Sequence, residues 1–118
     1  MPETKAASPM FTTETKHFPD GVVLLHCHGR LVAGTEDGLY DTVRELIPTN
    51  KRIILNLSEL QHTDSRGLGT LVRLYVAARS AGCSLELMHL SKQIRHLLGL
   101  TNLFDVFVVI GESGVKFM

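Results

Sequence analysis

The sequence predicts a single α/β domain in which an open, mixed β-sheet is flanked by helices. The first observation behind this is length, because 118 residues suit one domain of ordinary size. The second is patterning, because segments with helical spacing of apolar residues alternate with short apolar runs typical of strands. The third is composition, because 44% apolar and 20% charged residues are ordinary values for a soluble globular protein.

The N-terminal part of the chain predicts a leader followed by a hairpin. Residues 1–9 are polar and contain prolines, so we expect a flexible leader before a domain that covers residues 10–118. Weak alternation predicts an edge strand over 10–17, and an apolar run predicts a second strand over 22–28. Pro19-Asp20-Gly21 lies between them and has the residues of a turn, because proline fixes φ and glycine accepts a positive φ.

A helix is expected next. Thr35 is predicted at its N-cap, and two acidic residues follow in the first turn, where the helix dipole favours negative charge. Apolar residues then recur at i, i+4, i+7 and i+8, and Pro48 ends the pattern. The near-continuous apolar run over 52–57 predicts a strand that is covered on both faces.

The rest of the chain repeats this alternation. We expect a helix from about 65 to 81, a strand over 84–90, a third helix capped by Ser91, and a last strand over 106–110. The predicted order is ββαβαβαβ, which favours a mixed open sheet with helices on it. The buried stripe of the second helix is expected to comprise Leu68, Leu71, Val72, Tyr75 and Ala78.

Charge, cysteine content and hydropathy exclude several functional classes. Twelve basic residues balance twelve acidic ones, so we expect no nucleic-acid partner. Cys27 and Cys83 lack metal-binding spacing and are expected to be reduced thiols. No apolar run approaches the roughly 20 residues that cross a bilayer, and the N-terminus has no apolar signal segment. We therefore expect a cytoplasmic protein that does not insert into a membrane directly.

The turn Thr63-Asp64-Ser65-Arg66-Gly67 is the strongest candidate for a functional site. It follows a strand in an open α/β sheet, and ligands and partners meet such sheets at the carboxyl ends of the strands. Ser65 is expected at or just before a helix start, where unpaired N–H groups and the dipole can hold a phosphate, with Arg66 as an additional partner. The alternative is that Asp64 or Ser65 serves only as a helix cap.

Two glycines, Gly67 and Gly69, follow in the first turn of this helix. Each lowers the local helix propensity by about 1 kcal/mol relative to alanine. We expect them to keep the turn thin, so that the backbone of another protein can approach closely. A structural reason alone would rarely place two glycines there.

Histidines offer two weaker candidates. His26 and His28 lie at i and i+2 on one strand face and can present two metal ligands, but the sequence fixes no third ligand, so no metal site is expected. His62 beside Asp64 and Ser65 suggests a hydrolase, but the nucleophile elbow G-x-S-x-G is absent, as is a Walker loop. We therefore expect a protein that is not an enzyme and needs no cofactor.

The stretch over residues 52–69 resembles the signature of STAS domains, in particular of the anti-sigma-factor antagonists. Family members carry an apolar strand, a short connection, and a D-S-x-G-L-G sequence that leads into a helix. The resemblance covers about residues 10–110, and the order and spacing of its motifs are specific. Its other segments are Gly29-Arg30-Leu31 followed by Thr35, residues 77–87, and residues 94–104.

This resemblance implies a function. Such antagonists bind an anti-sigma factor, often a serine kinase of ATPase fold, and thereby free a sigma factor for transcription. The kinase phosphorylates the serine directly after the motif aspartate, which abolishes binding, and a phosphatase restores it. Carried onto this chain, the resemblance implies that this serine is Ser65. The partner-binding residues that the resemblance implies are Arg30, Thr35, Thr63, Asp64, Arg66, Gly67, Leu68 and Gly69.

Two residues depart from the family pattern. The family often has a second serine where this chain has Arg66, and many antagonists have an aspartate where this chain has Val32. These departures keep an alternative open from a different functional class. In that alternative the chain is an unphosphorylated STAS adaptor subunit of a membrane transport complex, of the ABC type that moves phospholipids.

Overall fold

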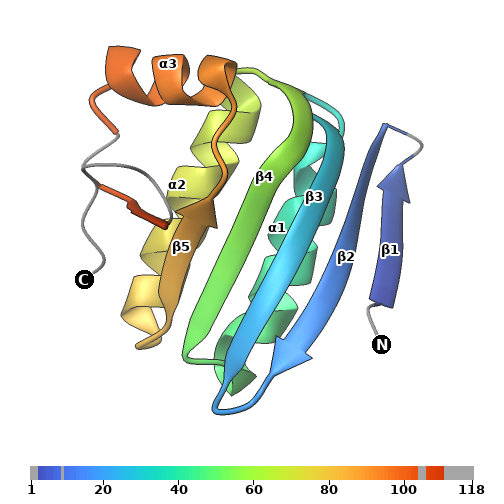
Figure 1. The fold of residues 1–118 in the computed structure, drawn as a ribbon, viewed down its shortest axis with the longest axis vertical. Coiled ribbons are helices and arrows are strands. Elements are labelled where there is room, and N and C mark those ends of the chain that lie inside the picture. The colour runs from blue at the N-terminus through green and yellow to red at the C-terminus, as the bar shows by residue number, and fades with distance from the viewer. Residues whose placement is uncertain (1–2, 9, 104–105, 111–118) are drawn as a thin grey trace.

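The computed structural model describes residues 3–8, 10–103 and 106–110, which form one mixed, open sheet with helices packed on it (Figure 1). The six strands of this sheet lie side by side in chain order. The first three are antiparallel neighbours, and the last three continue the sheet parallel to β3. Their bounds are β1 Glu3–Ser8, β2 Phe11–Phe18, β3 Val22–Leu31, β4 Arg52–Thr63, β5 Ser84–Met88 and β6 Val108–Ile110.

Helices connect the parallel strands, as the alternating pattern predicts. Among the described residues these are α1 (Glu36–Leu46) with the short 3-10 turn η1 (Ile47–Thr49), α2 (Ser65–Ser80) and α3 (Lys92–Leu100). α1 and α2 lie next to each other on one face of the sheet, whereas α3 lies beyond the carboxyl end of β5 and contacts β4 (Figure 1). None of the helices in the described part of the chain has both the length and the apolar character that a bilayer-crossing helix needs.

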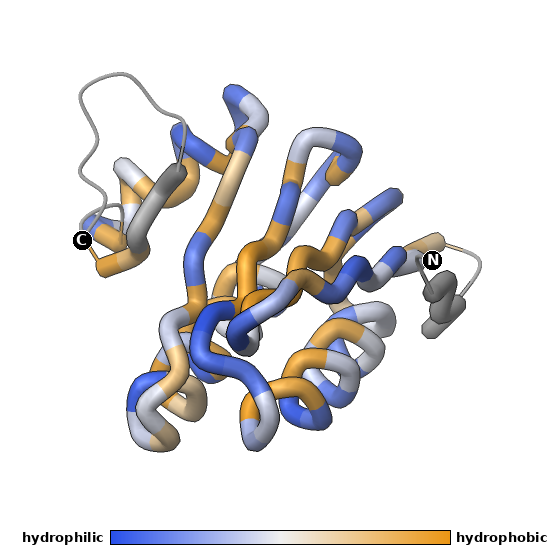
Figure 2. Tube along the Cα trace, turned by 60° about the horizontal axis from the view of Figure 1, so that its bottom comes forward, coloured by the Kyte–Doolittle hydropathy of each residue, from blue (hydrophilic) through white to orange (hydrophobic). Residues whose placement is uncertain are grey.

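The hydrophobic core lies between the sheet and the two helices α1 and α2. Figure 2 shows hydrophobic residues on the central strands and on turns of the helices beneath them. On α2, Leu74 is fully buried, while Val72 and Tyr75 are only half-buried. The buried stripe of this helix therefore includes Leu74, which the prediction lacks, and has Val72 and Tyr75 at its margin. The largest fully buried side chains are Phe11, Leu25, Leu31, Leu39, Ile53, Leu55, Leu57, Leu71, Leu74, Leu87, Ile94 and Leu98.

The N-terminal segment differs from the flexible leader that the sequence predicts. Residues 3–8 form β1, which pairs antiparallel with β2, while residues 1–2 and 9 lie outside the described residues. β1 therefore supplies hydrogen-bond partners for the outer edge of β2, which would otherwise expose a row of backbone groups. This short polar segment has no apolar periodicity from which a strand could be predicted. Its strand conformation depends on the pairing with β2.

β4 also differs from its prediction. The sequence predicts a strand over residues 52–57 covered on both faces, but β4 continues to Thr63 and pairs with β3 along its whole length, with two shifts in register. The second half of β4 is mostly polar, so it lacks the apolar run from which a strand is predicted. Only one face of β4 is packed under helices, where Ile53 and Leu55 are fully buried, while Ile54 on the other face is half-buried.

Candidate functional site

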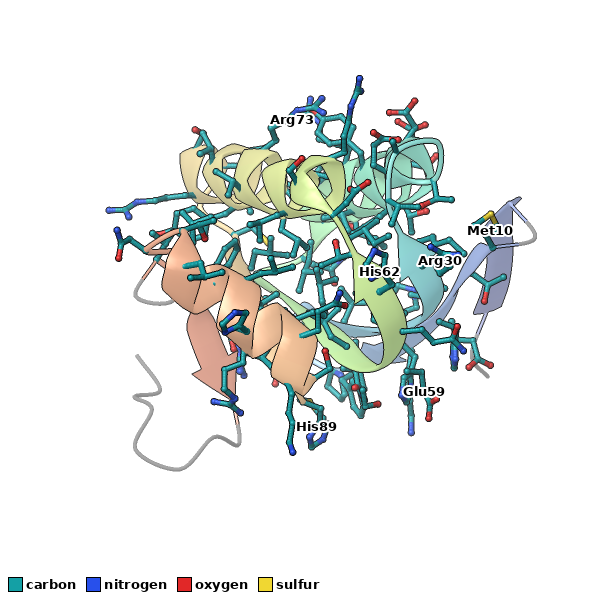
Figure 3. The ribbon with its side chains drawn as sticks, turned by 90° about the horizontal axis from the view of Figure 1, so that it is seen from above. Met10, Arg30, Glu59, His62, Arg73 and His89 are labelled. Atoms are coloured by element: carbon teal, nitrogen blue, oxygen red, sulfur yellow. The ribbon has the colours of Figure 1, made fainter. Side chains whose placement is uncertain are left out.

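The carboxyl ends of β3 and β4 lie side by side and begin the two loops of the candidate site. Leu31 ends β3 directly opposite Thr63, which ends β4. The Thr63 hydroxyl donates a hydrogen bond of 2.7 Å to the Leu31 carbonyl, and the Asp64 N–H donates to the same carbonyl at 3.4 Å. Figure 3 shows their neighbours Arg30 and His62 on adjacent strands at this end of the sheet. Both loops therefore start from one fixed point.

Asp64 is the N-cap of α2, and it also holds the loop that follows β3. Its Oδ1 accepts a hydrogen bond of 3.0 Å from the Gly67 N–H, as an N-cap does. Its Oδ2 accepts one of 3.0 Å from the Ala33 N–H in the other loop. The bond from Gly67 and then that from Ala33 lower the pKa of Asp64, so its carboxylate is charged at neutral pH. One side chain thus joins the two loops.

Ser65 is the first residue of α2, and its side chain is exposed. Because Asp64 occupies the cap position, the Ser65 hydroxyl is not needed to complete the helix end. Within the described part of the chain, this hydroxyl has no hydrogen-bond partner. Of the two residues that the sequence offers as a cap, Asp64 therefore takes that role, and Ser65 presents a free hydroxyl at the N-terminus of a helix.

Arg66 forms an ion pair with the start of α1. Its Nη1 lies 3.6 Å from Oε2 of Glu36, whose other oxygen accepts a hydrogen bond of 2.7 Å from the Gly34 N–H. The Arg66 side chain is 72% exposed, and ion pairs of this kind at the surface contribute little to stability. Arg66 therefore keeps a positive charge that an anion beside it can recruit.

The two glycines of this turn have different surroundings. A Cβ on Gly67 would lie 2.1 Å from the Leu31 carbonyl oxygen and 2.3 Å from Oγ1 of Thr63, so only glycine lets α2 approach the end of β3 this closely. A Cβ on Gly69 would meet nothing within 4 Å. The expectation that structure alone does not account for the glycines is therefore wrong for Gly67. At Gly69 the space where a side chain would lie is open.

Thr35 occupies the N-cap position of α1, as predicted, but its hydroxyl bonds to the loop instead of the helix. The hydroxyl donates to the Arg30 carbonyl at 2.7 Å and accepts from the Val32 N–H at 3.0 Å. Thr35 is buried, whereas the Arg30 side chain is exposed. Thr35 therefore shapes the loop that presents Arg30.

The sequence-predicted site residues divide into a presenting group and a positioning group. Arg30, Ser65 and Arg66 are exposed, Asp64 and Gly69 are half-buried, and Thr35, Thr63, Gly67 and Leu68 are buried. The buried residues can act only through the loop positions that they fix, since their side chains pack inside the molecule.

Sequence reasoning missed two members of the site, Ala33 and Glu36. From the sequence, Glu36 is expected only to interact with the dipole of the first helix, yet its carboxylate accepts the Gly34 N–H and faces Arg66. The local signal was its spacing, because an acidic residue two positions after a loop N–H can accept that hydrogen bond. The hydrogen bond from Ala33 to Asp64 joins two loops that are far apart in the chain, so no local sequence pattern predicts it.

His62 does not form a catalytic group with Ser65 and Asp64. Its Nδ1 lies 2.7 Å from Nε2 of Gln93 on α3, and both carboxylate oxygens of Asp64 accept backbone N–H groups. A Ser–His–Asp relay requires an imidazole that is hydrogen-bonded to both the serine and the aspartate. The described residues around this turn hold no such relay.

Comparison with known proteins shows which family shares this fold and sequence pattern. The family model of the STAS domain matches residues 15–115. An anti-sigma factor antagonist from Mycobacterium paratuberculosis is similar in structure, with a TM-score of 0.76 and 19% identity over 92% of each chain. SpoIIAA of Bacillus, an anti-sigma factor antagonist with known unphosphorylated and phosphorylated forms, is also similar. Its unphosphorylated form has a TM-score of 0.71 and 17% identity over 85% of this chain and 89% of that one.

A transport-related protein shares the fold as well. The sulfate transporter family protein from Wolinella succinogenes has a TM-score of 0.67 and 22% identity, over 77% of this chain and 75% of that one. At such identities each likeness concerns the fold. The match to the family model shows more than the fold, because the matched residues include both loops of the site.

Proposed function

The chain belongs to the STAS domain family, and we propose that it is an anti-sigma-factor antagonist whose partner binding is switched off by phosphorylation of Ser65. Its partner in this proposal is an anti-sigma factor that is also a serine kinase of ATPase fold, and a phosphatase restores the binding form. The chain itself is then a cytoplasmic regulator of transcription and not an enzyme. The observation that carries the proposal is the exposed Ser65 hydroxyl at the start of α2, on a surface that Asp64 assembles from two loops.

A phosphate on Ser65 would be tolerated by the folded chain. It adds about −1.5 to −2 charges at pH 7. The N–H groups and the positive dipole end of α2 stabilise such a charge, and Arg66 is close enough in sequence to turn toward it from its weak pair with Glu36. The charged Asp64 carboxylate opposes this on one side. These effects offset one another, so we expect phosphorylation to leave the fold intact.

The same phosphate would weaken the binding of a partner that covers this surface. The added charge would have to be desolvated inside the interface or would meet like charge there. A loss of about 3–5 kcal/mol weakens binding by roughly 10²- to 10⁴-fold. Phosphorylation can therefore switch binding without any change of shape in this chain.

Phosphate mapping tests the modification. The protein is incubated with ATP and a candidate serine kinase of ATPase fold, and the modified residue is located by mass spectrometry. We expect one phosphate, on Ser65, and none on the Ser65→Ala variant. Ser80→Ala is the matched control, because Ser80 is an exposed serine at the other end of α2. Incorporation into Ser65→Ala at the wild-type level would contradict the proposal.

Partner binding tests the switch itself. Ser65→Asp is expected to weaken binding to the kinase by roughly 10²-fold or more, because it places a negative charge within the interface. Ser65→Ala is expected to bind like the wild type, and Ser80→Asp controls for an added charge elsewhere on the same helix. Calorimetric titration measures all of these affinities. A Ser65→Asp variant that binds as tightly as the wild type would refute the switch.

A second function is an adaptor subunit of a membrane transport complex of the phospholipid ABC type, without phosphorylation. Arg66 and Val32 favour it, because both residues depart from the pattern of the phosphorylated antagonists. The likeness to a sulfate transporter family protein is in keeping with a transport role. A pull-down with the tagged chain separates the two functions, because one recovers a kinase of ATPase fold and the other recovers ABC transporter subunits.

A further inference from the structure

Three potential metal ligands lie together on the face of the sheet that α1 and α2 leave open. Glu14 on β2 is directly opposite His26 on β3 in the antiparallel register, so the two side chains project from the same face. His28 is two residues beyond His26 on β3 and shares that face. The sequence shows the two histidines, and the strand pairing supplies the carboxylate that the sequence alone does not fix.

The distances within this cluster suit a shared ion. Nε2 of His28 lies 2.9 Å from Oε1 of Glu14, and one ligand atom from each of the three residues lies within 4.8 Å of the others. Metal–ligand bonds of about 2.0–2.1 Å place neighbouring ligands of a tetrahedral ion roughly 3.4 Å apart. The three side chains would therefore have to rotate until their ligand atoms reach that spacing. The rings of His26 and His28 are already stacked, with centroids 5.2 Å apart.

The surroundings leave room for an ion and for a further ligand. All three side chains are half-buried, which anchors them yet keeps them accessible from solvent. A recess of about 160 Å³ adjoins the cluster and is bounded by Lys16 and Leu24 together with Glu14 and His26. The ammonium of Lys16 lies over the ring of Phe18, 5.3 Å from its centroid, so its positive charge already has an aromatic partner.

We propose that Glu14, His26 and His28 form a binding site for a divalent metal ion of the zinc type. Two imidazoles and one carboxylate match the ligands that this ion takes in sites that keep one position open. The ion would connect β2 to β3, and its fourth position would face the adjoining recess. The site lies on the strands and not on the loops around Ser65, so it is independent of the proposed switch.

Zinc titration tests the site. Zn²⁺ is added to the metal-stripped chain, residues 1–118, in an isothermal calorimeter. One ion is expected to bind per chain. Loss of a residue that merely orients a metal ligand costs about 10- to 100-fold in affinity, so His26→Ala, His28→Ala and Glu14→Gln should each cost at least about 100-fold. His17→Ala is the matched control, because His17 is exposed on β2 and lies outside the cluster.

A second measurement uses the unaltered protein and so does not depend on how the variants fold. Zn²⁺ should shift the ring NMR signals of His26 and His28 and leave those of His17 and His96 unchanged. The Ser65→Ala variant should bind Zn²⁺ like the wild type, whatever the outcome of the phosphorylation experiments. The proposal is overturned if Zn²⁺ fails to bind, if His17→Ala loses as much affinity as the ligand variants, or if other histidines shift in place of His26 and His28.

Discussion

The two faces of the sheet are built from alternating residues of the same strands, and they differ in what they hold. On the face under α1 and α2, Leu25 and Leu55 are fully buried. On the opposite face, their sequence neighbours Leu24 and Ile54 are only half-buried. Figure 3 shows this opposition from above, with Arg73 of α2 on one side of the sheet and His89 on the other.

The open face carries polar groups in place of a second apolar layer. Glu14 pairs with His28 between β2 and β3, and Arg52 pairs with Glu86 between β4 and β5. A slip of one residue would turn every side chain of a strand to the other face, so packing on the covered face also fixes which residues meet on the open face. The apolar core therefore determines where the polar clusters form.

The largest effect is expected from shortening a leucine on the covered face. Leu55→Ala removes a fully buried side chain and should lower the free energy of unfolding by about 2–5 kcal/mol. Ile54→Ala, its neighbour on the open face, should cost about half as much, because part of its surface already contacts water. Urea denaturation of both variants measures the difference. Equal losses would show that both faces are packed alike.

The same contrast between inward and outward positions should appear within the first turn of α2. Gly67→Ala forces a Cβ against the end of β3 and should cost about 1–3 kcal/mol or more. Gly69→Ala adds a methyl group where space is open and should stabilise the helix by up to about 1 kcal/mol. Thermal unfolding compares the two. A neutral Gly67→Ala would mean that α2 does not approach β3 as closely as the structure shows.

Much of the covered face could be predicted from sequence, because helical and strand periodicities are local. The apolar residues that recur at helical spacing before Pro48 do face the core: Leu39 and Val43 of α1 and Ile47 of η1 are buried, and Leu46 packs against them partly buried. Ser91 caps α3 as expected. The turn around Ser65 was found for the same reason, since its motif is continuous in the chain. Elements whose conformation depends on pairing with another strand were not predicted, including β1 and the second half of β4.

The open face was the hardest part to predict. Whether Glu14 meets His26 depends on the register of a hairpin, and a shift of one residue at its turn would separate them. The link from Asp64 to Ala33 depends in the same way on how β3 and β4 end. Such contacts follow from packing elsewhere in the molecule, so no local pattern of residues carries them.

The smallest loss of stability is expected from removing the ion pair on the open face, and it depends on pH. Arg52 donates two hydrogen bonds to Glu86, of 2.9 and 2.7 Å, and Ser84 donates a third of 2.8 Å. Burial raises the pKa of Glu86, but the hydrogen bonds from Arg52 and Ser84 outweigh it, so the net pKa is lowered. Glu86 therefore stabilises the fold above its unfolded pKa of about 4.3, and this contribution is lost as the pH falls through the folded value.

Arg52→Ala should change the shift in the pKa of Glu86 from lowered to raised. The carboxylate of Glu86 stays buried but loses its main partner, so the burial that raises its pKa now dominates. At pH 7 the variant should lose about 1–2 kcal/mol, at the low end for a charged hydrogen bond because Arg52 is 47% exposed. The loss should shrink at pH 4, where protonated Glu86 no longer carries a buried charge. Arg30→Ala removes an exposed arginine and should change stability little at either pH, so a loss from Arg52→Ala that stays constant with pH would show that Glu86 is solvated on the open face.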